Sequence, residues 1–167
     1  KNKQAFFNYT IDESIEAAPT SIKNVKVQIR DGKTGELERE AAPEAFTQCS
    51  GRGPNWCHQR ILVANFRGLD TPRDFVVKLG ATLVAFDEKL NVLWTYTCPW
   101  TEYANCPAYI PAVGDIDGDG RDEVLGGYYL IDEVGAVVWE EKLGKNLDSV
   151  AITEWDDGNV RAICSGF

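Results

Sequence analysis

The stretch "YYLIDEVGAVVW" (Tyr128–Trp139) repeats the pattern of an earlier stretch, "LVAFDEKLNVLW" (Leu83–Trp94). In both, an apolar run is followed by Asp-Glu, a short polar turn and a second apolar run that ends in Trp. Turn residues between two runs of β-prone side chains are typical of a hairpin. Each stretch is therefore predicted to form two antiparallel strands, the third and fourth of a repeated unit.

The repeat extends to the residues before each hairpin. The segment "CSGRGPNWC" (Cys49–Cys57) aligns with "CPWTEYANC" (Cys98–Cys106), and a partial third copy, "SVAITEWDDGNVRAICSG", begins near Ser149. Each full unit contains four short apolar runs divided by Asp/Gly-rich turns, and no long segment shows a 3.6-residue period. Four strands in a unit of about 45 residues predict the blades of a β-propeller.

We therefore expect an all-β fold made of four-stranded antiparallel blades. The predicted organisation is an N-terminal strand and linker (1–24), a half blade (25–45), a full blade (58–98), a second full blade (107–143) and a half blade (149–167). This amounts to about three blades with open ends, whereas known propellers have at least four. The chain is either part of a longer one, or its open ends pair with those of other copies.

Charge and hydropathy exclude two classes of partner. The formal net charge is −9, and nucleic-acid binding needs clustered cations. No apolar run reaches the roughly 20 residues of a membrane-spanning helix. At 167 residues the chain is long enough to bury a core of its own.

The segment "DIDGDGRDEVLGG" (115–127) has the composition of a calcium loop. Calcium prefers six to eight oxygen ligands, which alternate carboxylates and a backbone carbonyl provide. Gly118 and Gly120 allow a tight wrap. An EF-hand would need Glu at the twelfth loop position, which is Gly126, so that motif is excluded. The alternative is an acid-rich turn without metal. The predicted ligands are Asp115, Asp117, Asp119, the Arg121 carbonyl and Glu123.

The preceding copy of this loop has lost acidic residues, whereas the last copy keeps Glu154, Asp156 and Asp157 but is one residue shorter. When the two units are aligned without a gap, the positions in the preceding unit that match the predicted ligands are Phe66, Gly68, Asp70 and Asp74. Only two carboxylates remain there. We expect no calcium there. A metal that one unit can lose is more consistent with a structural role than with catalysis.

The loop resembles the calcium-binding FG-GAP (VCBS-type) propeller repeat. Over roughly residues 58–167, the acidic loop followed by the hairpin Asp132–Trp139 is also similar to the propeller of secreted, calcium-dependent rhamnogalacturonan lyases. The resemblance implies a calcium-binding propeller in an extracellular carbohydrate-active protein. These motifs belong to the blade and not to an active site, so the resemblance implies no catalytic residue.

The cysteines are consistent with an extracellular location. Cys49 and Cys57 are eight residues apart, and so are Cys98 and Cys106. Zinc sites usually have shorter Cys spacings, so these two pairs favour loop-closing disulfides; five reduced thiols are the alternative. Cys164 is left over and is expected to be a buried free thiol. Asn8 begins an Asn-Tyr-Thr sequon and is a candidate glycosylation site. The predicted disulfides are Cys49–Cys57 and Cys98–Cys106.

The two cysteine-paired segments connect successive blades on the face opposite the acidic loop. Aromatic rings beside polar donors suit sugar recognition, and Arg also pairs with a uronate carboxylate. The alternative is that these rings only cap the propeller core. The predicted carbohydrate-binding residues are Arg52, Trp56, Trp100, Tyr103 and Tyr109.

Two functions remain open from the sequence. The first is a calcium-stabilised extracellular propeller that binds carbohydrate as part of a polysaccharide lyase. Its candidate base is His58 or Tyr103, and Arg52 or Arg60 would neutralise the uronate. A lone His is nonetheless more often structural. The second is a non-enzymatic extracellular module for protein interaction, adhesion or self-assembly.

Overall fold

The computed structural model of the chain describes residues 3–12, 21–49, 60–99, 110–141, 147–155 and 157–166. These ranges contain strands and one short 3-10 helix, so the expected all-β class is confirmed. None of their helices is long and apolar enough to cross a membrane. The elements are β1 (Lys3–Asp12), β2 (Ser21–Asp31), β3 (Leu37–Ala41), η1 (Glu44–Cys49), β4 (Arg60–Ala64), β5 (Asp74–Leu79), β6 (Thr82–Phe86), β7 (Val92–Thr97), β8 (Ala112–Gly114), β9 (Glu123–Leu125), β10 (Tyr129–Ile131), β11 (Val137–Glu140), β12 (Leu147–Glu154) and β13 (Val160–Gly166).

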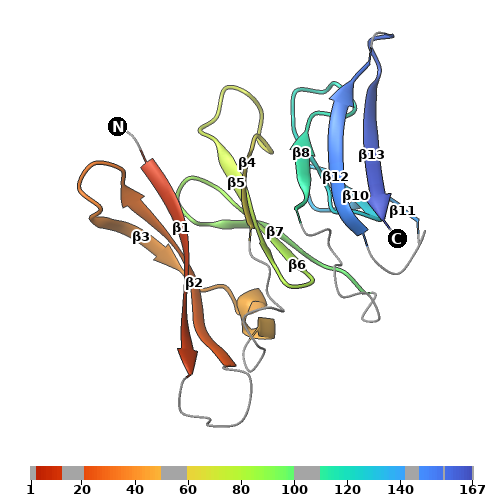
Figure 1. Ribbon diagram of the computed structural model, residues 1–167. Helices are drawn as coiled ribbons and strands as arrows, with labels where there is room; N and C mark the ends of the chain where they lie inside the picture. The colour runs from red at the N-terminus through yellow and green to blue at the C-terminus, as the bar shows by residue number, and fades with distance from the viewer. Residues whose placement is uncertain are drawn as a thin grey trace.

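The strands form four antiparallel sheets in which neighbours along the chain are neighbours in the sheet. The first sheet contains β1–β3, the second β4–β7, the third β8–β11 and the fourth β12–β13. Figure 1 shows these sheets in chain order, from β1 at one end to β13 at the other, without closure into a ring. Short hairpin connections produce this order, because they can join only adjacent antiparallel strands.

The second sheet is buried on both faces. All six residues of β5 are buried, and successive side chains of a strand point to opposite faces. Phe75 and Val77 pack with the first sheet, while Val76 packs with the third. Burial on both faces explains why β5 reads as an almost continuous apolar run instead of an alternating one.

The first sheet has one strand more than the half blade predicted for 25–45. β1 pairs antiparallel with β2 along its length, and the register shifts between Asn8 and Thr10. β1 lies in the range 1–24, for which the sequence predicts a strand and a linker. Behind β2, Phe46 of η1 contacts Phe86 of the second sheet, with ring centroids 6.1 Å apart.

Two hairpin turns have the Asp-based geometry that the sequence predicts. Asp87 and Asp132 each accept, at Oδ1, a hydrogen bond from the backbone amide four residues later, at 2.8 and 2.6 Å. Three residues after each Asp the backbone is left-handed, with φ of 68° at Leu90 and 89° at Gly135. The two hairpins therefore share a shape although only one contains glycine.

Gly135 also serves the contact between the second and third sheets. A Cβ there would lie 2.6 Å from Cβ of Trp94, far inside normal contact. Nε1 of Trp94 donates a hydrogen bond to the Glu133 carbonyl at 3.0 Å. Trp94 thus joins the second sheet to the hairpin of the third by close backbone approach and one hydrogen bond, whereas its repeat counterpart Trp139 is exposed.

The fourth sheet packs on the third through Ile152, whose side chain lies against Gly114. Its other side is open in the described residues, with Trp155 and Ile163 exposed. The prediction that Cys164 is a buried free thiol is half wrong: the thiol is free but the residue is exposed. The thiol faces the third sheet, where its Sγ donates a hydrogen bond to the Gly127 carbonyl at 3.4 Å, so it lies at a contact between two sheets and not within a closed core.

Candidate metal centre

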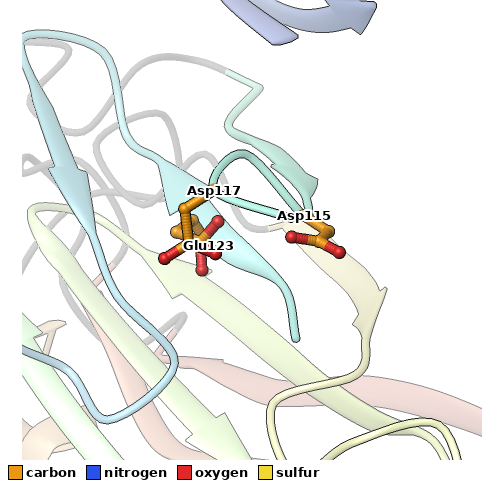
Figure 2. Close-up of side chains that lie close together, drawn as sticks. All are labelled: Asp115, Asp117 and Glu123. Atoms are coloured by element: carbon orange, nitrogen blue, oxygen red, sulfur yellow. The ribbon is translucent and has the colours of Figure 1, made fainter. Parts of the chain in front are cut away.

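The loop between β8 and β9 brings three carboxylates together. Asp115 directly follows β8, Asp117 comes two residues later, and Glu123 opens β9. One oxygen from each lies within 4.8 Å of the others, and Figure 2 shows the three side chains around this loop. Carboxylate oxygens in such a group are the ligands that a hard divalent cation prefers.

Backbone amides of the loop hold Asp115 in place. Gly118 N donates to its Oδ1 at 2.7 Å and Gly120 N donates to its Oδ2 at 2.9 Å. Both glycines have left-handed φ values, 83° and 86°, which glycine adopts without steric cost. The loop therefore wraps tightly around the carboxylate that begins it.

Glu123 lies at the buried side of the cluster. It is 3 % exposed, and its Oε2 accepts a hydrogen bond from Ile116 N at 2.6 Å. Burial raises the pKa of Glu123 to about 7, and the negative charges of Asp117 and Asp115 contribute to the rise. A buried carboxylate beside two others is unfavourable unless a cation neutralises it. The electrostatics of the loop thus favour a bound cation.

Three of the five predicted ligands converge. Asp119 lies outside the three-carboxylate group, and its Oδ1 accepts a hydrogen bond from Arg121 N at 2.8 Å. The Arg121 side chain pairs with Glu133 at 3.1 Å, and a guanidinium has no acceptor atom, so only the backbone carbonyl of Arg121 could bind a metal. Three carboxylates, a carbonyl and water can supply the six to eight oxygens of calcium, so the donor set fits that ion.

Strand pairing shows which residues of the second sheet correspond to this loop. Ala64 pairs with Asp74, the first residue of β5, and Gly114 pairs with Glu123, the first residue of β9. Ala64 therefore takes the place of Gly114, and Asp74 takes that of Glu123. The intervening segment 65–73 is one residue longer than 115–122, so an ungapped alignment of the two loops is wrong.

The corrected register changes the residues that are compared. Asn65 takes the place of Asp115, and Arg67 takes that of Asp117. Gly68, with φ of 98°, corresponds to the left-handed Gly118. Sequence reasoning missed Asn65 and Arg67, although a one-residue gap would have aligned Asn-x-x-Gly with Asp-x-x-Gly. This register replaces the predicted matches Phe66, Gly68 and Asp70.

Arg67 supplies a positive charge to the loop of the second sheet. Its Nε donates to Asp74 Oδ1 at 2.8 Å, and its NH2 group contacts Glu88 Oε2 at 2.5 Å. These bonds, first to Asp74 and then to Glu88, raise the pKa of Arg67. The Asp74 side chain is fully buried, so the guanidinium neutralises a carboxylate that water does not reach.

The predicted carbohydrate face begins at the opposite edge of the sheets. In an antiparallel sheet β7 ends, and β8 begins, away from the 115–122 loop. Cys98, which follows β7, is buried and disulfide-bonded. Arg60 opens β4 there and is partly exposed. The remaining predicted residues on this face are outside the described part of the chain: Arg52, Trp56, Cys57, His58, Trp100, Tyr103, Cys106 and Tyr109.

Two further predictions concern Cys49 and Asn8, whose backbone is described but whose side chains are not. Cys49 ends η1, but its side chain is not described, so both disulfide pairings stay predictions. Asn8 lies in β1 opposite Lys26 of β2. Glycosylation of Asn8 also stays a prediction.

No protein-family model and no curated protein matches this chain. Solved structures of rhamnogalacturonan lyases do. The exotype rhamnogalacturonan lyase YesX matches 97 % of this chain with 20 % identity and a TM-score of 0.69, and rhamnogalacturonan lyase YesW matches 84 % with 22 % identity and a TM-score of 0.66. A rhamnogalacturonan lyase of Bacillus licheniformis matches 85 % with 18 % identity and a TM-score of 0.50.

At these identities the likeness shows a shared fold. The chain spans between 26 % and 35 % of the length of these lyases. It therefore has the fold of one part of such enzymes.

Proposed function

We propose that this chain is a calcium-stabilised segment of an extracellular β-propeller that binds carbohydrate as part of a rhamnogalacturonan-type polysaccharide lyase. The observation that carries the proposal is the fold match with an exotype rhamnogalacturonan lyase over 97 % of this chain. Two successive four-stranded antiparallel sheets packed face to face, each with the same Asp-based hairpin turn, support the assignment of propeller blades. Its partners would be carbohydrate and further blades.

Calcium has a structural role in this proposal. Asp115, Asp117 and Glu123 would hold the ion together with the Arg121 carbonyl, and the ion would neutralise a buried carboxylate. The loop lies at the edge of the sheets opposite the predicted carbohydrate face. The cation would therefore stabilise the blade and take no part in a reaction with the polysaccharide.

Carbohydrate binding is assigned to the opposite face. Arg60 is partly exposed where β4 begins, and a guanidinium there can pair with a uronate carboxylate. His58 and Tyr103 remain the candidate bases, with Arg52, Trp56, Trp100 and Tyr109 as further sugar contacts. In lyase chemistry the base removes the proton beside the carboxylate, and a cation stabilises the negative charge that develops.

Binding and cleavage of rhamnogalacturonan test this proposal directly. Calorimetry with rhamnogalacturonan oligosaccharides measures binding, and absorbance of the unsaturated uronate product measures cleavage. Arg60→Ala should weaken binding about tenfold or more, because a charge-assisted pair is lost. Lys89→Ala is the control, since this exposed cation lies in the β6–β7 turn at the calcium-loop edge. Equal binding by both variants would remove Arg60 from the site.

A second candidate function is an interaction or self-assembling module without enzymatic activity. The observation in its favour is the group of exposed apolar side chains at the C-terminal end of the stack, which includes Trp139, Trp155 and Ile163. Sedimentation of the full chain at increasing concentration measures self-association. Self-association together with no binding of any rhamnogalacturonan fragment would favour this function over the first.

A further inference from the structure

Asn65 connects the second sheet to the acidic loop of the third sheet. Its Nδ2 donates to the Gly120 carbonyl at 2.9 Å, and its backbone N donates to Asp122 Oδ2 at 2.7 Å. Asp122 N donates in return to the Asn65 carbonyl at 3.1 Å. Asn65 is 3 % exposed. One buried residue of the preceding sheet thus makes three hydrogen bonds to the loop.

These bonds hold the backbone on both sides of Arg121. The Gly120 carbonyl belongs to the peptide before Arg121, and Asp122 N belongs to the peptide that carries the Arg121 carbonyl, so Asn65 holds both peptides that flank Arg121. Asp122 in turn directly precedes Glu123, the buried carboxylate of the cluster. The position of the carbonyl and of Glu123 therefore depends on a residue that lies 50 positions before Asp115 in the chain and in another sheet.

The side-chain amide of Asn65 has no other role in the described structure. Its Oδ1 is buried without a hydrogen-bond partner among the described residues, and such an atom is costly. An apolar side chain at this position would avoid that cost but could not bond the Gly120 carbonyl. A carboxylate, as in Asp115 at the corresponding position of the third sheet, would lack the donor. The amide is suited to its bond with Gly120.

We propose that Asn65 is a positioning residue for the cation, and that cation binding and the docking of the second sheet against the third stabilise each other. This inference rests on the proposed calcium site. If Asn65 orders the loop in its binding conformation, it removes part of the ordering cost of binding. By thermodynamic linkage, a bound cation then strengthens the Asn65 contact by the same factor.

Calcium titration of three proteins tests the inference. In Asn65→Ala the dissociation constant for calcium should rise roughly three- to tenfold, the equivalent of one hydrogen bond. Trp94→Phe is the matched control, because it removes a hydrogen bond between the same two sheets whose acceptor, the Glu133 carbonyl, lies outside the 115–122 loop. Its dissociation constant should stay within about twofold of the wild type.

Each outcome separates the inference from the proposal beneath it. If the wild-type protein does not bind calcium, both are overturned. If it binds and Asn65→Ala binds equally well, or if Trp94→Phe weakens binding as much, only the positioning role is overturned. If Asn65→Ala does not fold, hydrogen exchange of the wild type decides: calcium should slow exchange at the amides of Asn65 and Asp122, and unchanged exchange would reject the coupling.

Discussion

The loop after β4 contains a cationic side chain, Arg67, bonded to the buried carboxylate. The loop after β8 instead brings three carboxylates together. In both, an acidic residue opens the second strand of the sheet and is buried: Asp74 in the second sheet and Glu123 in the third. Arg67 bonds Asp74, while Asp117, in the place of Arg67, lies in the carboxylate group with Glu123. The same backbone position thus supplies a positive charge in one sheet and a negative charge in the other.

This difference shows that two four-stranded sheets of the same topology can neutralise a buried carboxylate in two ways. A buried carboxylate at the start of a strand must be neutralised. A side-chain cation does this permanently and independently of solution conditions. A group of carboxylates does it only when a metal ion is present, which makes stability depend on that ion.

The largest expected effect on stability comes from removing the Arg67 guanidinium. Arg67→Ala leaves the fully buried Asp74 side chain without its guanidinium, and breaking such a pair costs about 3–5 kcal/mol. Denaturant unfolding measures the loss. Arg73→Ala, an exposed residue of the same loop, should change the free energy of unfolding by less than about 0.5 kcal/mol. Similar values for both variants would contradict the role of Arg67.

The second largest expected effect is on the melting temperature when calcium is removed. A chelator should lower the melting temperature by roughly 5–10 °C, because calcium at a hundredfold excess over its dissociation constant adds about 2.7 kcal/mol. Asp117→Ala should melt at the same temperature with and without chelator. Asp70→Ala, an exposed acid of the loop after β4, should keep the full sensitivity. Calcium-independent melting of the wild type would reject the metal site.

A smaller effect is expected in the pH dependence of the calcium-free protein. Glu123 has a pKa of about 7 in the folded state and an ordinary value of 4.5. Between these values the folded state binds the extra proton, so the contribution of Glu123 to stability falls as the pH rises through this window. Denaturant unfolding in chelator at pH 5 and at pH 7.5 measures the slope. Glu123→Gln should have a shallower slope, and an identical slope would contradict the raised pKa.

The smallest effect is expected for the Arg121 side chain. It makes an exposed ion pair with Glu133, and such pairs contribute about 0–1 kcal/mol. Arg121→Ala keeps the backbone carbonyl, so the dissociation constant for calcium should stay within about threefold of the wild type. Calorimetric titration measures it. A loss of more than tenfold would show that the side chain, and not the carbonyl, serves the site.

Local patterns in the sequence were sufficient for the class of fold and for the core of the site. The hairpin of Tyr128–Trp139, the four-strand units and the acidic loop depend on side-chain period, turn residues and carboxylate spacing, which are properties of short segments. Such patterns also placed Asp115, Asp117 and Glu123 in one loop, where three carboxylates do converge. They could not predict that Asp119 lies outside this group, because the curvature of the loop decides which of several alternate acids face inward.

Only the tertiary structure decided the relations between segments. The pairing of Ala64 with Asp74 and of Gly114 with Glu123 corrected the loop register, which a comparison of letters had missed by one residue. Packing between sheets brought Asn65 to Gly120 and Trp94 to Gly135. The packing of the fourth sheet on the third left Cys164 exposed, with its thiol bonded to the Gly127 carbonyl. The sequence alone determined what each strand and turn can form, whereas contacts between residues distant in the chain follow from sheet packing, which no local pattern records.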